Sequence, residues 1–261
     1  REKIGDRVAL VQDFVPPIVS NRWNSVDIKS TENDVAYNWR SKGYEQIVTQ
    51  RASILKELMS LTHLNILYSD TDIHWLKDPR DVIRRKYSKF DICIQREQSD
   101  AVGDYNCSGF LLLKYSQLML IFLETWAEYI EERLKRPGFF TDQTEMNRLL
   151  TDIKRKRLRE RRYDYLYRTS AETFDWDEFP SGINYFAHRV PGKGTRSKIC
   201  RSKTCSKYVW KLVSDKVNRK KSRHTKSYIV HHNFAKSNQI KISRAKRNGL
   251  WLNLESNDWF D

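Results

Sequence analysis

The sequence lacks the features of several protein classes. It has no uninterrupted run of about 18 apolar residues, so no segment is expected to span a membrane as a helix. Only four cysteines occur in 261 residues, with no C-x-x-C pair and no Cys/His set at zinc-finger spacing. Internal repeats and low-complexity tracts are also absent. A hydrophobic content of 39% nevertheless gives enough apolar surface for a globular core.

Acidic residues are outnumbered, at 33 against 48 Lys and Arg, for a net charge of +15. The excess is concentrated in two segments. Residues 151–168 carry eight basic residues against three acidic ones, and residues 193–226 carry thirteen against one. The rest of the chain is close to neutral. The two basic segments could face an anionic partner or form solvated loops.

Apolar patterns alternate between the strand and helix types along the chain. Apolar runs predict strands at residues 65–69, 110–113, 183–186 and 228–233, and an alternating pattern predicts one at residues 90–95. Apolar residues at three- and four-residue steps predict helices at residues 45–61, 116–136, 142–151 and 237–247, and a short polar helix is expected at residues 80–87. Ser116 and Thr141 are the expected N-caps of the helices at residues 116–136 and 142–151. The stem of Arg51 falls on the apolar stripe of the helix at residues 45–61. We predict an α/β fold with a mainly parallel sheet flanked by helices.

Two aspartates stand where the strand at residues 65–69 ends. Residues i and i+2 of an extended chain point to the same side, so Asp70 and Asp72 can aim both carboxylates at one point. A bare D-x-D is more often a solvated acidic turn. Converging carboxylates need a cation, a shared proton or open water, and oxygen ligands suit a hard divalent ion such as Mn²⁺ or Mg²⁺.

Two other predicted strands carry polar or small residues at their ends. Gly109 would let a ligand approach the backbone closely, and His231-His232-Asn233 offers imidazoles. Ligands of open α/β sheets bind at strand ends, and Mn²⁺ accepts mixed oxygen and imidazole ligands. Adjacent histidines are also common as ordinary polar residues.

Two features concern covalent modification. Cys200 and Cys205 could close a small disulfide loop if the protein is secretory. The sequon at Asn106 immediately precedes an apolar strand, and we expect it to be buried and unmodified.

The segment at residues 67–79 (LYSDTDIHWLKDP) resembles the LYSDxDxxWLxDP pattern of nucleotide-diphospho-sugar transferases of glycosyltransferase family 77. Four further pieces match that family in the same order. They are residues 107–110 (CSGF), residues 141–150 (TDQTEMNRLL), residues 179–186 (FPSGINYF), and a closing block of His231, Asn233, Lys241 and residues 249–251. The resemblance covers residues 45–251.

This resemblance implies a GT-A, Rossmann-like fold and a divalent metal, Mn²⁺ or Mg²⁺. It implies transfer of a galactose, xylose or arabinose type sugar from a UDP-sugar to a glycan or glycoprotein, with retention of configuration. Asp70, Asp72 and His231 would be metal ligands. The donor would contact Asp70, Asp72, Gly109 and Lys241, with Lys241 on its diphosphate.

Asp142 and Gln143 would face the transferring sugar. A carboxamide such as Gln143 could support an oxocarbenium-like carbon, and Asp142 is the candidate nucleophile if a covalent intermediate forms. The alternative for Asp142 is a helix N1 carboxylate stabilised by the helix dipole.

We expect one catalytic domain over residues 1–261, with residues 193–226 as a basic insert. The nucleoside-binding first βα unit is not evident in residues 1–44, so it is degenerate or precedes Arg1. Ser237 stands where the family has a glycine. The start at Arg1 suggests an excised fragment of a type II membrane protein of the Golgi lumen or secretory pathway, contacting membrane only through a segment outside this chain.

Two other functions remain open. Asp70 and Asp72 could serve a metal-dependent phosphohydrolase or nuclease, but the other strand-end acids, Asp91 and Asp104, fit no pattern. The basic segments could instead form a glycan- or nucleic-acid-binding module. Nucleic acid is not expected as a partner, because no nucleic-acid-binding motif occurs, and the basic segments would also suit an anionic acceptor.

Overall fold

The computed structural model describes residues 8–12, 42–97, 105–138, 140–158, 161–182, 226–233 and 238–247. The chain divides into two compact units. The first comprises residues 1–71, 79–96 and 105–174, and the second comprises residues 72–78, 97–104 and 175–261. The predicted strand at residues 183–186, Cys200, Cys205, residues 249–251 and nearly all of the basic insert lie outside the described residues. The single catalytic domain stays a prediction.

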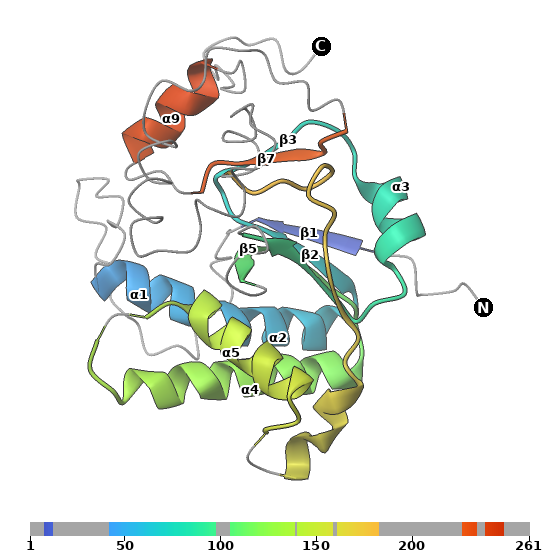
Figure 1. The fold of residues 1–261 in the computed structure, drawn as a ribbon, viewed down its shortest axis with the longest axis vertical. Helices are drawn as coiled ribbons and strands as arrows, with labels where there is room; N and C mark the ends of the chain where they lie inside the picture. The colour runs from blue at the N-terminus through green and yellow to red at the C-terminus, as the bar shows by residue number, and fades with distance from the viewer. Residues whose placement is uncertain are drawn as a thin grey trace, which may run out of the picture. The chain divides into compact units, whose positions relative to one another are not determined.

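The first unit is built on a five-stranded sheet (Figure 1). Its strands, in spatial order, are β1 (Val8–Gln12), β2 (Asn65–Ser69), β5 (Asn106–Leu113), β4 (Ile92–Arg96) and β6 (Ala171–Thr173). The pairs β1–β2 and β4–β6 are parallel, whereas β5 is antiparallel to both β2 and β4. The sheet is therefore mixed, where the sequence predicted a mainly parallel one.

The predicted α/β class with flanking helices is confirmed. The helices of this unit are α1 (Lys42–Thr49), α2 (Arg51–Thr62), α3 (Arg80–Val82), the π-helix η3 (Ile83–Tyr87), α4 (Gln117–Leu134), α5 (Asp142–Lys154) and the 3₁₀ helix η4 (Arg161–Arg168). The segment predicted as one helix over residues 45–61 is two helices, because the chain turns at Gln50.

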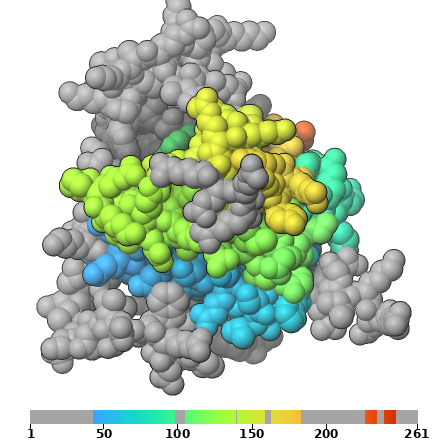
Figure 2. All heavy atoms as spheres, turned by 90° about the horizontal axis from the view of Figure 1, so that it is seen from below, coloured from blue at the N-terminus to red at the C-terminus, as the bar shows by residue number. Residues whose placement is uncertain are grey.

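Helices α2, α4 and α5 gather on one side of the sheet (Figure 1), and side chains of α2 and α4 adjoin one another across the face seen in Figure 2. Phe122 and Trp126 of α4 are fully buried between them, with Met146 of α5. The hydroxyls of Ser116 and Thr141 accept hydrogen bonds from the backbone N–H groups of Met119 (3.1 Å) and Thr144 (3.3 Å), so both predicted N-caps are confirmed.

The expected burial of the sequon is confirmed. Asn106 is the first residue of β5 and is 7% exposed. Its backbone N–H donates to Oδ1 of Asn147 at 2.9 Å, and its carbonyl accepts from Nδ2 of Asn147 at 2.8 Å. One side chain of α5 thus completes the main-chain hydrogen bonding where β5 begins.

The second unit contains two antiparallel strands, β3 (Ile73–Trp75) and β7 (Ile229–His231), which pair Ile73 with His231. It also contains helix α9 (Asn238–Arg247). The segment at residues 175–182 runs beside the start of β7, where the N–H of Tyr228 donates to the carbonyl of Glu178 at 2.7 Å. Among the described residues, no helix is long and apolar enough to cross a membrane.

Candidate active site

In the second unit, Asp72 lies immediately before β3 and joins two basic groups. Its Oδ1 is 3.1 Å from Nε2 of His231, and its Oδ2 is 2.8 Å from Nζ of Lys241 on α9. The strand pairing fixes this arrangement, because His231 is opposite Ile73 and the N–H of His232 donates to the carbonyl of Asp72 at 2.9 Å. The structure thus brings together three site residues that span 170 positions of the sequence.

The charges around Asp72 keep it ionised. Burial by itself would raise the pKa of this carboxyl, but the imidazole of His231 and the ammonium of Lys241 outweigh it and hold the pKa well below its usual range. Neighbouring His232, 1% exposed, is kept neutral, since burial and then the nearby ring of His74 lower its pKa to about 3. The two adjacent histidines therefore have different environments.

In the first unit, Asp70 lies at the end of β2. Its carboxylate accepts hydrogen bonds from the hydroxyl of Tyr68 at 2.8 Å and from the guanidinium of Arg51 at 3.0 Å. Its N–H donates to the carbonyl of Gly109 in β5 at 2.8 Å. Gly109 therefore lies directly beside Asp70, although inside a strand rather than at the end of one.

Arg51 also binds the predicted catalytic helix. Its Nη1 donates to Oδ2 of Asp142 at 2.7 Å and to Oγ of Ser108 at 2.6 Å. Asp142 is almost fully buried, and burial raises the pKa of its carboxyl, while the Arg51 guanidinium opposes that shift. Oε1 of Gln143 accepts from the N–H of Ser108 at 3.1 Å, so Gln143 is fixed against β5.

Sequence reasoning missed the roles of Arg51 and Tyr68. The sequence assigned only the aliphatic stem of Arg51 to the core, yet its charged head joins two buried or half-buried carboxylates. The available signal was a cation on the apolar stripe of a helix, which is costly unless a carboxylate is paired with it. Tyr68 reads as an ordinary strand aromatic, and nothing in its sequence context indicates its hydrogen bond to Asp70.

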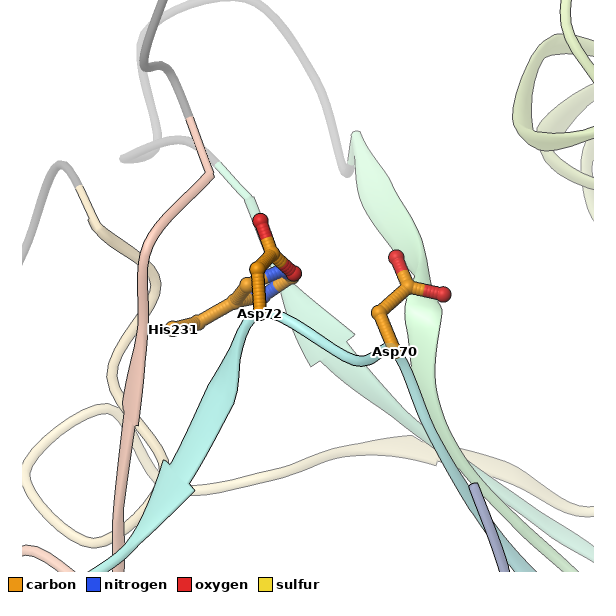
Figure 3. A group of neighbouring side chains, drawn as sticks. All are labelled: Asp70, Asp72 and His231. Atoms are coloured by element: carbon orange, nitrogen blue, oxygen red, sulfur yellow. The ribbon is translucent and has the colours of Figure 1, made fainter. Parts of the chain in front are cut away.

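The residues expected to bind a metal have suitable chemistry. Asp70, Asp72 and His231 (Figure 3) are the one group of three acidic, His or Cys side chains among the described residues that could hold an ion. Two carboxylates and an imidazole suit Mn²⁺, and ionised Asp72 is in the form that binds metal.

Comparison with known proteins gives the class of the molecule. The chain belongs to the nucleotide-diphospho-sugar transferase family, whose model matches residues 16–245. The predicted resemblance is thus confirmed, and the prediction of a glycosyltransferase is confirmed at the level of the family.

Two relatives come from Arabidopsis thaliana. UDP-D-xylose:L-fucose alpha-1,3-D-xylosyltransferase 3 is 26% identical over 83% of this chain and 50% of its own length. UDP-D-xylose:L-fucose alpha-1,3-D-xylosyltransferase MGP4 is 22% identical over 97% of this chain and 64% of its own length. The chain therefore spans between half and two thirds of these relatives. No solved structure matches it significantly.

Proposed function

We propose that this chain transfers a sugar from a UDP-sugar to a glycan or glycoprotein, with retention of configuration and with a divalent metal, Mn²⁺ or Mg²⁺. The observation that carries the proposal is the bridge from Asp72 to His231 (3.1 Å) and Lys241 (2.8 Å). A carboxylate beside an imidazole can hold a cation, and the same carboxylate keeps a lysine next to it. The metal ion and the lysine ammonium would together balance the negative charge of a diphosphate.

Each site residue then has a part in the transfer. Asp70, Asp72 and His231 would hold the metal, which when bound would neutralise charge on the diphosphate. The ammonium of Lys241 would bind the diphosphate and stabilise the charge that forms as the bond between the sugar C1 and the β-phosphate oxygen breaks. Gly109 lies in β5, and its carbonyl accepts a hydrogen bond from the N–H of Asp70. Gly109 would lie against the donor.

Asp142 and Gln143 are proposed to face the transferring sugar from the N-terminus of α5. Oε1 of Gln143 accepts a hydrogen bond from the N–H of Ser108, which restricts the orientation of its amide group. Asp142 is held at one oxygen by Arg51. It remains the candidate nucleophile for a covalent intermediate, in which its carboxylate would bond to C1 as UDP departs.

The donor is proposed to be a UDP-pentose or UDP-galactose, with UDP-xylose first, because both relatives are named as UDP-D-xylose-dependent xylosyltransferases. The acceptor is proposed to be a glycan or glycoprotein, which could be anionic. Lys154, Arg155, Lys156 and Arg157 form an exposed basic run at the end of α5 that would suit such an acceptor. The Golgi lumen or secretory pathway is the proposed compartment.

The test is donor hydrolysis and transfer with UDP-xylose, UDP-galactose and UDP-arabinose, in Mn²⁺ and in chelator. We expect turnover that needs the metal and is lost in Asp72→Asn. Asp81→Asn is the matched control, because Asp81 is exposed and, among the described residues, its carboxylate pairs only with Arg84, at 3.7 Å. If no sugar nucleotide binds or reacts, or if Asp72→Asn keeps metal-dependent turnover, the proposal is wrong.

A further inference from the structure

Two motifs that are far apart in the sequence bind each other in the second unit. The backbone N–H of Gly182 donates to Oδ1 of Asn233 at 2.6 Å. A Cβ at position 182 would lie 2.5 Å from that oxygen and 2.7 Å from the carbonyl oxygens of Asn233 and His231. Contacts under 3.0 Å are essentially unknown for real Cβ atoms. Only glycine allows position 182 to approach the chain that carries His231.

This contact holds the backbone around His231 from the side opposite β3. On one side, His231 pairs with Ile73, and the N–H of His232 donates to the carbonyl of Asp72. On the other side, Oδ1 of Asn233 accepts a hydrogen bond from the N–H of Gly182. The direction of the His231 side chain toward Asp72 depends on both constraints, because a peptide segment held on one side only can rotate about its φ and ψ angles.

Asn233 also contacts the helix that carries Lys241. The backbone carbonyl of Asn233 accepts a hydrogen bond from Nη1 of Arg244 at 3.4 Å, and Arg244 is fully buried at 1% exposure. Arg244 follows Lys241 by three residues on α9, so the two side chains leave the helix from the same region. Asn233 thus connects the strand of the imidazole to the helix of the ammonium.

We propose that Asn233, seated on Gly182, is a positioning residue that sets His231 and Lys241 around Asp72. This inference rests on the proposed function for the role of the two basic groups. It assigns one shared task to Asn233, from the closing block of the family resemblance, and to Gly182, from the matched segment at residues 179–186. The proposed role is indirect, because Asn233 and Gly182 would act through the positions of His231 and Lys241.

The experiment compares Asn233→Ala with Asn233→Asp, which keeps an acceptor oxygen for the N–H of Gly182. The matched control is Ser181→Ala. Ser181 is buried next to Gly182, and the substitution removes the hydrogen bond from its Oγ to the carbonyl of Glu97 at 3.0 Å. Gly182→Ala is a second variant, and circular dichroism confirms that each protein is folded.

The first measurement is made without metal. Hydrogen exchange of the His232 amide reports the bond to Asp72, and we expect it to be roughly tenfold faster in Asn233→Ala and unchanged in Ser181→Ala. The second is Mn²⁺ binding. We expect roughly 10- to 100-fold weaker affinity in Asn233→Ala and Gly182→Ala, and wild-type affinity in Asn233→Asp and Ser181→Ala.

The two measurements separate the two proposals. If wild-type protein does not bind Mn²⁺, the metal site is wrong, and the exchange rate alone decides whether Asn233 holds the Asp72–His231 pair. If folded Asn233→Ala keeps wild-type exchange at His232, the positioning role is wrong. It is equally wrong if Asn233→Asp loses as much Mn²⁺ affinity as Asn233→Ala.

Discussion

The guanidinium of Arg51 and the carboxylate of Asp142 form a 2.7 Å ion pair although 91 positions separate them in the sequence. Their side chains are 10% and 2% exposed, so the pair is largely excluded from solvent. Arg51 opens α2 and Asp142 opens α5, and Arg51 reaches Asp70 as well. One cation therefore pairs with both predicted site carboxylates of the first unit.

Replacing Arg51 should destabilise the protein strongly. Arg51→Met leaves Asp142 buried without its partner, and we expect the free energy of unfolding to fall by about 3 kcal/mol. The loss should be larger at pH 8 than at pH 5. The pKa of Asp142 is already raised by burial, so the unpaired carboxyl can accept a proton at the lower pH. Urea unfolding at the two pH values measures both effects.

The control for this prediction is Lys56→Met. Lys56 pairs with Glu124 at 2.9 Å, but both side chains are substantially exposed, at 36% and 52%. Its loss should cost about 1 kcal/mol or less. The double variant Arg51→Met with Asp142→Asn should recover part of the stability. Equal losses for Lys56→Met and Arg51→Met would contradict a buried, compensating role for Arg51.

Stability should fall with acid because of His232. Its pKa is about 3 in the folded chain against an ordinary value of 6.5. Above pH 6.5 the ring is neutral in the folded and in the unfolded chain. Below pH 6.5 the ring binds a proton in the unfolded chain but stays neutral in the folded one. The free energy of unfolding should therefore drop by up to about 1.4 kcal/mol per pH unit from pH 6.5 toward pH 3.

Urea unfolding between pH 7 and pH 5 in metal-free buffer checks this dependence before most carboxylates titrate. His232→Asn removes the ring. The slope of its free energy of unfolding against pH should be smaller than that of the wild type by the amount that one bound proton contributes. A wild-type slope that His232→Asn leaves unaltered would show that other groups cause the acid sensitivity.

Cys93 should be chemically inert in the folded protein. It is fully buried in β4, and burial, with Glu172 and Asp91 nearby, raises the pKa of its thiol to about 12. Iodoacetamide at pH 8 should leave its tryptic peptide unmodified until urea unfolds the chain. Ser88→Cys, at an exposed position, gives the positive control. Rapid native labelling of Cys93 would mean that β4 opens locally.

Local signals in the sequence predicted the helix starts well. Ser116 and Thr141 cap α4 and α5 as expected, because the capping hydrogen bond involves residues only three positions apart. Gln50 was harder, since the apolar steps continue across it while the backbone turns there. The break places Arg51 at the start of α2.

Strand direction could not be read from strand composition. All eight residues of β5 are buried, and its apolar run reflects burial on both faces. That pattern is the same for a parallel and an antiparallel central strand. β5 lies antiparallel between β2 and β4, and direction depends on the connections between strands.

The candidate site was predictable only where a motif carried it. Asp72, His231 and Lys241 were expected from the family resemblance, and the structure brings them together. Arg51 and the seat of Asn233 on Gly182 were not, because both depend on contacts between segments that no local pattern connects. A charged residue on an apolar stripe and a glycine within the matched segment at residues 179–186 were the available signals.

The burial of Asn106 has a consequence for biosynthesis. In a secretory host, an oligosaccharide attached to this sequon during translation would not fit the buried position of the Asn106 side chain, where β5 pairs with β4. Glycan addition and native folding are therefore mutually exclusive outcomes at this position. A glycosylated Asn106 would mark a chain that did not reach the native fold.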